Sequence, residues 1–113
     1  GQDAGRAEFV SVPGGSVWRV PTSEAARAVR AGGSEAGWRV LLAMVNGLDE
    51  RQAAKALGKR LGTVKTQGRM ARQKASRITG VDFEGGSASK RLVLVLVGFL
   101  PAPGLERGGA KGS

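Results

Sequence analysis

Nine lysine and arginine side chains fall between residues 47 and 80, and they are the feature of this sequence with the clearest chemistry. They are Arg51, Lys55, Lys59, Arg60, Lys65, Arg69, Arg72, Lys74 and Arg77. The same stretch holds two acids, Asp49 and Glu50, so nine minus two gives it +7 of the chain's net charge of +9. Positive charge concentrated in one segment predicts a polyanionic partner, whereas the alternative is an ordinary solvated basic surface.

Few residues of this sequence could support catalysis or metal binding. The 113-residue chain contains no cysteine and no histidine, which excludes disulfides, thiolate catalysis and nearly all transition-metal sites. The sequence shows neither a paired carboxylate cluster nor a phosphate-binding loop pattern. We therefore expect no enzyme activity, no cofactor, no metal and no small-molecule substrate.

The most apolar run of the chain, Leu92–Leu100, is nine residues long. A helix that crosses a membrane needs ~20 such residues, and no signal-peptide pattern is visible, so we expect no membrane partner. The lack of cysteine fits a reducing compartment, and we expect a cytoplasmic protein. The apolar run is compatible with a buried strand, a packed helix or an adhesive edge, and its pattern does not choose among them.

Helix signals surround the basic segment. Ser34 is a typical N-cap residue, and Trp38, Leu41 and Val45 recur on one face of the helix that would follow it. Gly47 stands where a left-handed residue would end that helix. The pattern predicts a helix that starts after Ser34 and stops before Gly47.

A second, shorter helix is predicted after Asp49. Asp49 and Gln52 have the spacing of a capping box, in which each side chain bonds the other's backbone N–H. Ala54 and Leu57 lie on the side that would be buried, and Gly58 would end the helix. The small Ala54 leaves room for another helix to cross closely.

A third helix is predicted from residues 62 or 63 to 77. Its inward stripe has a helical period and consists of Leu61, Val64, Gly68, Ala71, Ala75 and Ile78. The outward face consists of Lys65, Thr66, Arg69, Arg72, Gln73 and Ser76. Because this face carries no carboxylate, its cations have no partner within the helix, and we expect them to bind phosphate groups.

These residues resemble a known family. The resemblance lies in Gly47-Leu48, Ala54, Leu57-Gly58, Gly62-Thr63-Val64-Lys65-Thr66, Arg69 and Arg72. The pattern is similar to region four, the C-terminal DNA-binding region, of sigma-70-type sigma factors, especially the extracytoplasmic-function group. The resemblance covers about residues 34–76, and LuxR-type transcriptional regulators share much of the same core.

The resemblance implies that a helix-turn-helix binds double-stranded DNA in transcription initiation. In the family, the second motif helix enters the major groove of the promoter's −35 element, and the region also binds core RNA polymerase. A LuxR-type regulator and a non-specific basic nucleic-acid-binding protein are the alternatives. Scarce aromatic residues argue against a platform for stacking single-stranded bases.

Roles follow for individual side chains. Base edges would be read by Lys65, Thr66, Gln67 and Arg69, whose donors and acceptors suit the major groove. Phosphates would be bound by Lys59, Arg60, Thr63 and Arg72. The motif would be packed by Ala54, Leu57, Gly58 and Val64.

The sequence departs from the family pattern at several positions. Arg60 stands where the family has a Ser or Thr cap, which predicts a helix start weakened by roughly 1 kcal/mol. Gly68 replaces a common Leu, which predicts a loss of apolar burial worth ~1.5–3 kcal/mol. Lys59 occupies a usually apolar turn position, and Met70 stands where a basic residue is frequent.

The predicted fold class is all-α, a small helical bundle with a helix-turn-helix at residues 34–80 and irregular or disordered flanks. Residues 1–33 are expected to be irregular apart from a short helix capped by Ser23, although Val17–Val20 resembles a strand without an evident partner. Residues 81–113 are expected to form a linker, the short apolar run and a disordered tail. Because Ala and Gly dominate the inward faces, we expect residues 34–80 to be only marginally stable alone.

Overall fold

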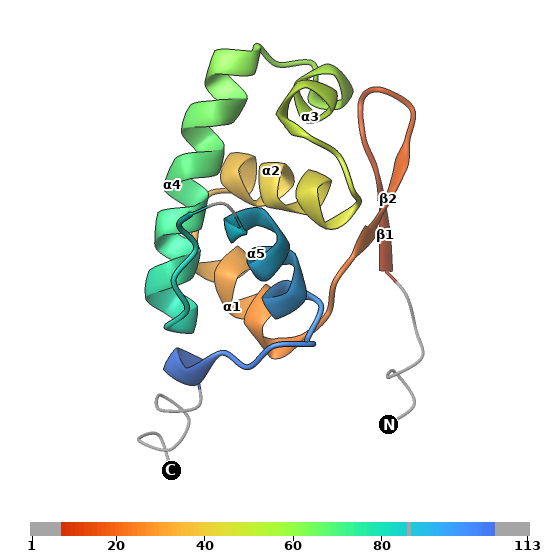
Figure 1. Cartoon of the computed structure of the whole chain (residues 1–113). Helices are drawn as coiled ribbons and strands as arrows, with labels where there is room; N and C mark the ends of the chain where they lie inside the picture. The colour runs from red at the N-terminus through yellow and green to blue at the C-terminus, as the bar shows by residue number, and fades with distance from the viewer. Residues whose placement is uncertain (1–7, 86, 106–113) are drawn as a thin grey trace.

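A long helix, α4 (Leu61–Thr79), lies along one edge of the molecule, and the other elements gather on one side of it (Figure 1). The computed structural model describes residues 8–85 and 87–105. In chain order the elements are β1 (Glu8–Ser11), β2 (Val17–Val20), α1 (Glu24–Gly32), α2 (Glu35–Val45), α3 (Glu50–Leu57), α4 and α5 (Ala88–Leu96). Helices α1, α2 and α3 contact α4, whereas α5 packs on α1 and α2. The described part of the chain is therefore mostly helical and contains one two-stranded sheet.

The helix boundaries follow the capping residues that the sequence predicts. The Ser34 side chain accepts a hydrogen bond from the Gly37 N–H at 3.0 Å. At α3, Asp49 and Gln52 form the reciprocal capping box. Gly58 ends α3 in the left-handed region with φ of 68°, as predicted, and Gly80 ends α4 in the same region with φ of 73°, so α4 is slightly longer than predicted. These local signals are confirmed because each satisfies backbone groups that a helix end leaves unpaired.

Helices α2 and α4 cross closely because small residues meet at the contact. A Cβ atom built on Gly68 would lie 3.2 Å from Val40 Cγ1, and one built on Gly37 would lie 3.2 Å from Ala71 Cβ. A larger residue at 68 would push the two helices apart. The prediction that Gly68 leaves apolar surface unburied is therefore wrong, because α2 occupies the space that a leucine side chain would fill.

The N-terminal flank is more ordered than predicted. Strands β1 and β2 pair antiparallel, with Val10 opposite Trp18, and α1 follows Ser23 as expected. Trp18 and Val29 are buried in the same core as the helices of the basic segment. The expectation of an irregular flank was wrong because the partner strand, β1, has no clear alternating pattern in the sequence.

The apolar run of the C-terminal flank also joins this core. Of its three alternatives the packed helix is correct, because Leu92, Val95 and Leu96 lie on α5 with none of their surface exposed. The inward faces of α3 and α4 are small, so these large side chains complete the core. The predicted disordered tail falls mainly on residues 106–113, which lie outside the described residues, as do residues 1–7.

The hairpin is joined to the helices by hydrogen bonds from the Asn46 side chain and from the backbone of its tip. Asn46, at the end of α2, accepts from the Arg19 N–H at 2.8 Å and donates to the Arg19 carbonyl at 2.9 Å. At the hairpin tip the Gly14 N–H donates to the Ala56 carbonyl of α3 at 3.0 Å. These contacts tie both ends of the hairpin to the layer that supports α4.

Candidate nucleic-acid interface

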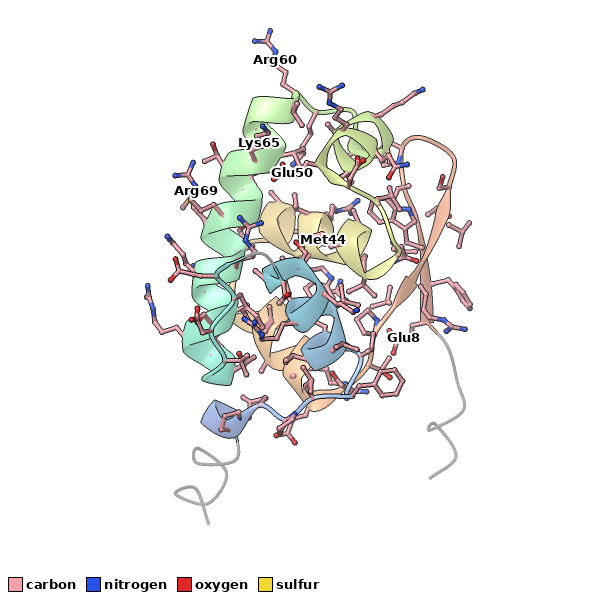
Figure 2. All side chains as sticks on the ribbon, in the orientation of Figure 1. Glu8, Met44, Glu50, Arg60, Lys65 and Arg69 are labelled. Carbon is pink, nitrogen blue, oxygen red and sulfur yellow. The ribbon has the colours of Figure 1, made fainter. Side chains whose placement is uncertain are left out.

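The outward face of α4 is continuous and strongly basic. The helix runs unbroken over 19 residues, and Lys65, Thr66 and Arg69 on its N-terminal half are exposed. Figure 2 shows Arg60 and Arg69 pointing away from the body of the molecule, with Lys65 between them along the helix. The structure therefore brings together three of the four predicted base-reading residues on one accessible surface, which we call the α4 ridge (Arg60, Thr63, Lys65, Thr66 and Arg69).

The start of α4 adds to the positive field of the ridge. No acid lies in the first turn of α4, and the Arg60 side chain makes no capping hydrogen bond. Unpaired N–H groups at a helix start carry a partial positive charge. A shallow depression lined by Arg60, Gly62, Thr63, Thr66 and Gln67 lies at this end. Negative charge is therefore favoured at the N-terminal end of the ridge.

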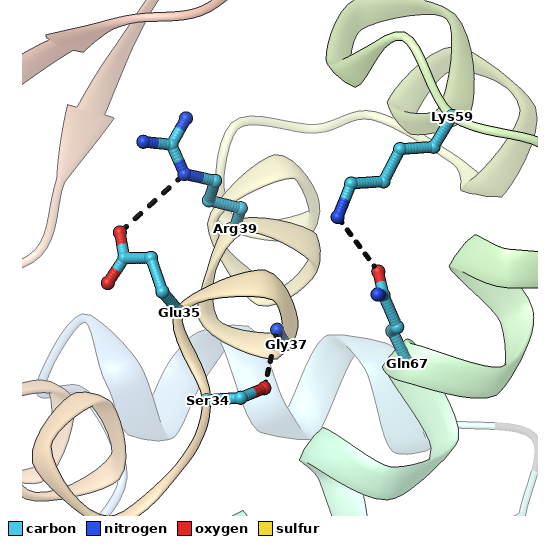
Figure 3. Close-up of polar contacts among 6 residues, drawn as sticks. All are labelled: Ser34, Glu35, Gly37, Arg39, Lys59 and Gln67. Carbon is cyan, nitrogen blue, oxygen red and sulfur yellow. Dashed lines mark hydrogen bonds and ion pairs between the residues drawn. The ribbon is translucent and has the colours of Figure 1, made fainter.

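Among the described residues, no acid lies within 4.0 Å of the cations of α4. Within residues 8–85 and 87–105, one ion pair is closer than 4.0 Å. It joins Arg39 Nε to Glu35 Oε2 at 3.6 Å, and both residues lie on α2 (Figure 3). Since the described part of the chain offers the guanidinium and ammonium groups of α4 no such partner, these groups are available to an incoming polyanion.

Gln67 is placed differently from the other predicted base readers. It is half-buried, and its Oε1 accepts a hydrogen bond from Lys59 Nζ at 3.2 Å, as Figure 3 shows. Reading adenine requires both the oxygen and the nitrogen of a glutamine amide. This contact uses the oxygen of Gln67 and also draws Lys59 inward, so both residues serve the packing of the turn in this structure.

Arg72 lies at the margin of the ridge. It is half-buried, and its Nη1 is 3.6 Å from the point where a Gly68 Cβ would stand. It lines a depression together with Arg69, Glu50, Asp82 and Glu84. The sequence of α4 contains no acid. The carboxylates beside Arg72 come from α3 and from the segment after α4, so the sequence alone does not reveal them. They weaken the positive field at this margin, so the N-terminal half of α4 is the stronger anion-binding part.

The residues assigned to packing lie beneath the ridge. Ala54, Leu57 and Val64 are buried in the shared core, and Gly58 takes the left-handed conformation between α3 and α4. The Lys59 N–H donates to the Ala54 carbonyl at 2.9 Å, which tightens the turn. The short connection and the buried side chains hold α4 rigidly on α3.

Comparisons with protein-family models, curated proteins and solved structures found no match to this chain. Every helix in the described part of the chain is too short or too polar to cross a membrane. Nor do the described residues contain a cluster of three or more acidic, histidine or cysteine side chains that could hold a metal ion.

Proposed function

We propose that this protein binds double-stranded DNA through the α4 ridge, with α3 and α4 acting as a helix-turn-helix and α4 lying in the major groove. The observation that carries the proposal is the unbroken helix whose exposed N-terminal half presents Lys65, Thr66 and Arg69 without an ion-pair partner among the described residues. A helix with this surface fits the width of the major groove.

The side chains of the ridge divide into two tasks. Lys65 and Arg69 donate to guanine O6 and N7, and the Thr66 methyl group contacts thymine. Arg60 and Thr63, at the end of α4 beside the turn, bind phosphates and set the register of the helix. Arg72 adds a weaker phosphate contact because it lies among carboxylates at the margin.

The resemblance to sigma-factor region four supports a narrower form of the proposal, in which the duplex is a promoter element and transcription initiation is the process. Core RNA polymerase is then a partner as well. The test therefore begins from unbiased DNA.

The experiment is selection of bound duplexes from a random pool, followed by affinity measurements on the selected sequence. Lys65→Ala should cost ~1–3 kcal/mol at particular base pairs and little on unrelated duplexes. Arg60→Ala should weaken binding to all sequences alike and reduce the salt slope by about 1. Lys90→Ala is the matched control, because Lys90 is an exposed cation on α5.

Three results would overturn the proposal. Equal affinity for every duplex would reject base reading and leave a non-specific nucleic-acid-binding protein. Tighter binding to structured RNA than to duplex DNA in a filter assay would reject DNA as the partner. A loss in Lys90→Ala equal to that in Lys65→Ala would show that total charge, and not the ridge, determines affinity.

A further inference from the structure

A cavity of about 260 Å³ lies on the other margin of α4, away from the carboxylates beside Arg72. It lies between the end of α1, the N-terminal half of α2 and the middle of α4, and is partly open to solvent. Val29, Trp38, Leu41, Met70 and Ala71 supply its apolar lining. None of these residues has a role in the proposed DNA contact, so the cavity requires its own explanation.

The rim of this cavity is positively charged. Lys74 and Arg77, two of the basic residues in the segment 47–80, line it from α4. No lining residue in the described part of the chain carries a carboxylate. Glu35 stands beside lining residue Ser34 in the sequence, but its carboxylate is directed to Arg39, as Figure 3 shows. An apolar interior with two cations and no acid is complementary to an apolar molecule that carries one negative charge.

Lys74 runs along Gly33 at one wall of the cavity. Gly33 and Gly37 line it, and Lys74 Cδ lies 4.0 Å from the point where a Gly33 Cβ would stand. The methylene stem of Lys74 therefore lies along Gly33 while its ammonium group reaches solvent, which is the usual behaviour of a long cationic side chain. A side chain at Gly33 would take the space along which Lys74 extends.

The size of the cavity limits its occupant. A volume of about 260 Å³ exceeds the ~150 Å³ that holds one benzene molecule and is below the ~300–1,000 Å³ of sites for drug-sized ligands. We propose that this cavity binds a small organic anion with an apolar body of about one ring, its carboxylate held by Lys74 and Arg77. The proposal does not depend on DNA binding, because Lys74 and Arg77 are not part of the α4 ridge.

The test uses three matched probes on the full chain. Phenylacetate carries the ring and the charge, phenylacetamide carries the ring alone, and acetate carries the charge alone. In amide and indole N–H NMR spectra, phenylacetate should give saturable shifts at Trp38, Gly33 and Gly37. Phenylacetamide and acetate should bind at least about tenfold more weakly, because each lacks one half of the complementarity.

Substitutions then test whether Lys74 and Arg77 supply the positive charge that binds the carboxylate. Lys74→Gln with Arg77→Gln should reduce the affinity for phenylacetate to that for phenylacetamide. Arg27→Gln with Lys90→Gln removes the same charge from exposed positions outside the cavity and should leave the affinity unchanged. Both double variants should keep the wild-type melting temperature in circular dichroism, since all four side chains are at the surface.

Several results would overturn the proposal. Equal binding of phenylacetate and phenylacetamide would remove the role of the rim charge. Linear, non-saturating shifts, or shifts centred on another part of the chain, would remove the site. Binding of an acidic phenylalanine-containing peptide at Trp38 without any binding of phenylacetate would replace the small anion by a protein segment. DNA affinity measured on the same samples separates these failures from a failure of the proposed function.

Discussion

The α3–α4 unit and the segments that flank it contribute different things to this molecule. The unit supplies the charge, because α4 has an exposed basic face and an inward face of mostly small residues such as Gly68 and Ala75. The flanks supply the large buried side chains, including Trp18 and Leu92. The surface proposed to bind DNA is therefore held in place by residues distant from it in the sequence.

The largest expected effect is the loss of folding when the segments before residue 34 and after residue 80 are removed. A fragment of residues 34–80 lacks Trp18, Val29 and α5, and so loses much of the apolar burial that opposes chain entropy. Its circular dichroism should show a weak, broad thermal transition, whereas residues 8–105 should melt cooperatively. A sharp transition of the fragment at high temperature would show that α2, α3 and α4 are sufficient by themselves.

A single substitution in α5 should weaken the whole molecule. Leu92 is fully buried on α5, so Leu92→Ala should lower the free energy of unfolding by ~2–5 kcal/mol through lost burial and a cavity. Leu94→Ala is the control, because Leu94 lies on the same helix but is only half-buried. Chemical denaturation measures both variants, and equal losses would mean that α5 does not pack as described.

The basic segment and the flanks also differ in how much of their structure the sequence reveals. The caps Ser34 and Asp49 and the buried Val64 could be predicted because each depends on a local pattern or a helical period. The pairing of β1 with β2 and the packing of α5 could not, because they depend on contacts between distant segments. The same limit applies to the site. Only the tertiary structure places Glu50 and Glu84 beside Arg72, and only the tertiary structure shows that Lys59 contacts Gln67.

Two glycines of α4 should respond in opposite ways to a larger side chain. Gly68→Leu should destabilise the protein by ~1–3 kcal/mol, because its Cβ alone would lie 3.2 Å from Val40 Cγ1 and the helices must separate. Gly62→Ala should instead stabilise it by ~0.5–1 kcal/mol, since nothing lies within 4 Å of that Cβ and alanine favours the helix. Thermal melts compare the two, and stabilisation by Gly68→Leu would contradict the close crossing of α2 and α4.

The smallest expected effect comes from substitutions of Arg60, which distinguish the stability of the α3–α4 unit from its proposed DNA binding. Arg60 precedes α4 without forming a side-chain cap, so Arg60→Ser should stabilise the helix start by ~1 kcal/mol. The same change removes a cation from the ridge and should weaken DNA binding at all sequences equally. Arg60→Ala removes the cation without adding a cap, so it should show the binding loss alone. If Arg60→Ser raised both the melting temperature and the DNA affinity, Arg60 would not contact phosphate, and a well-formed helix start would matter more to binding than the charge it carries.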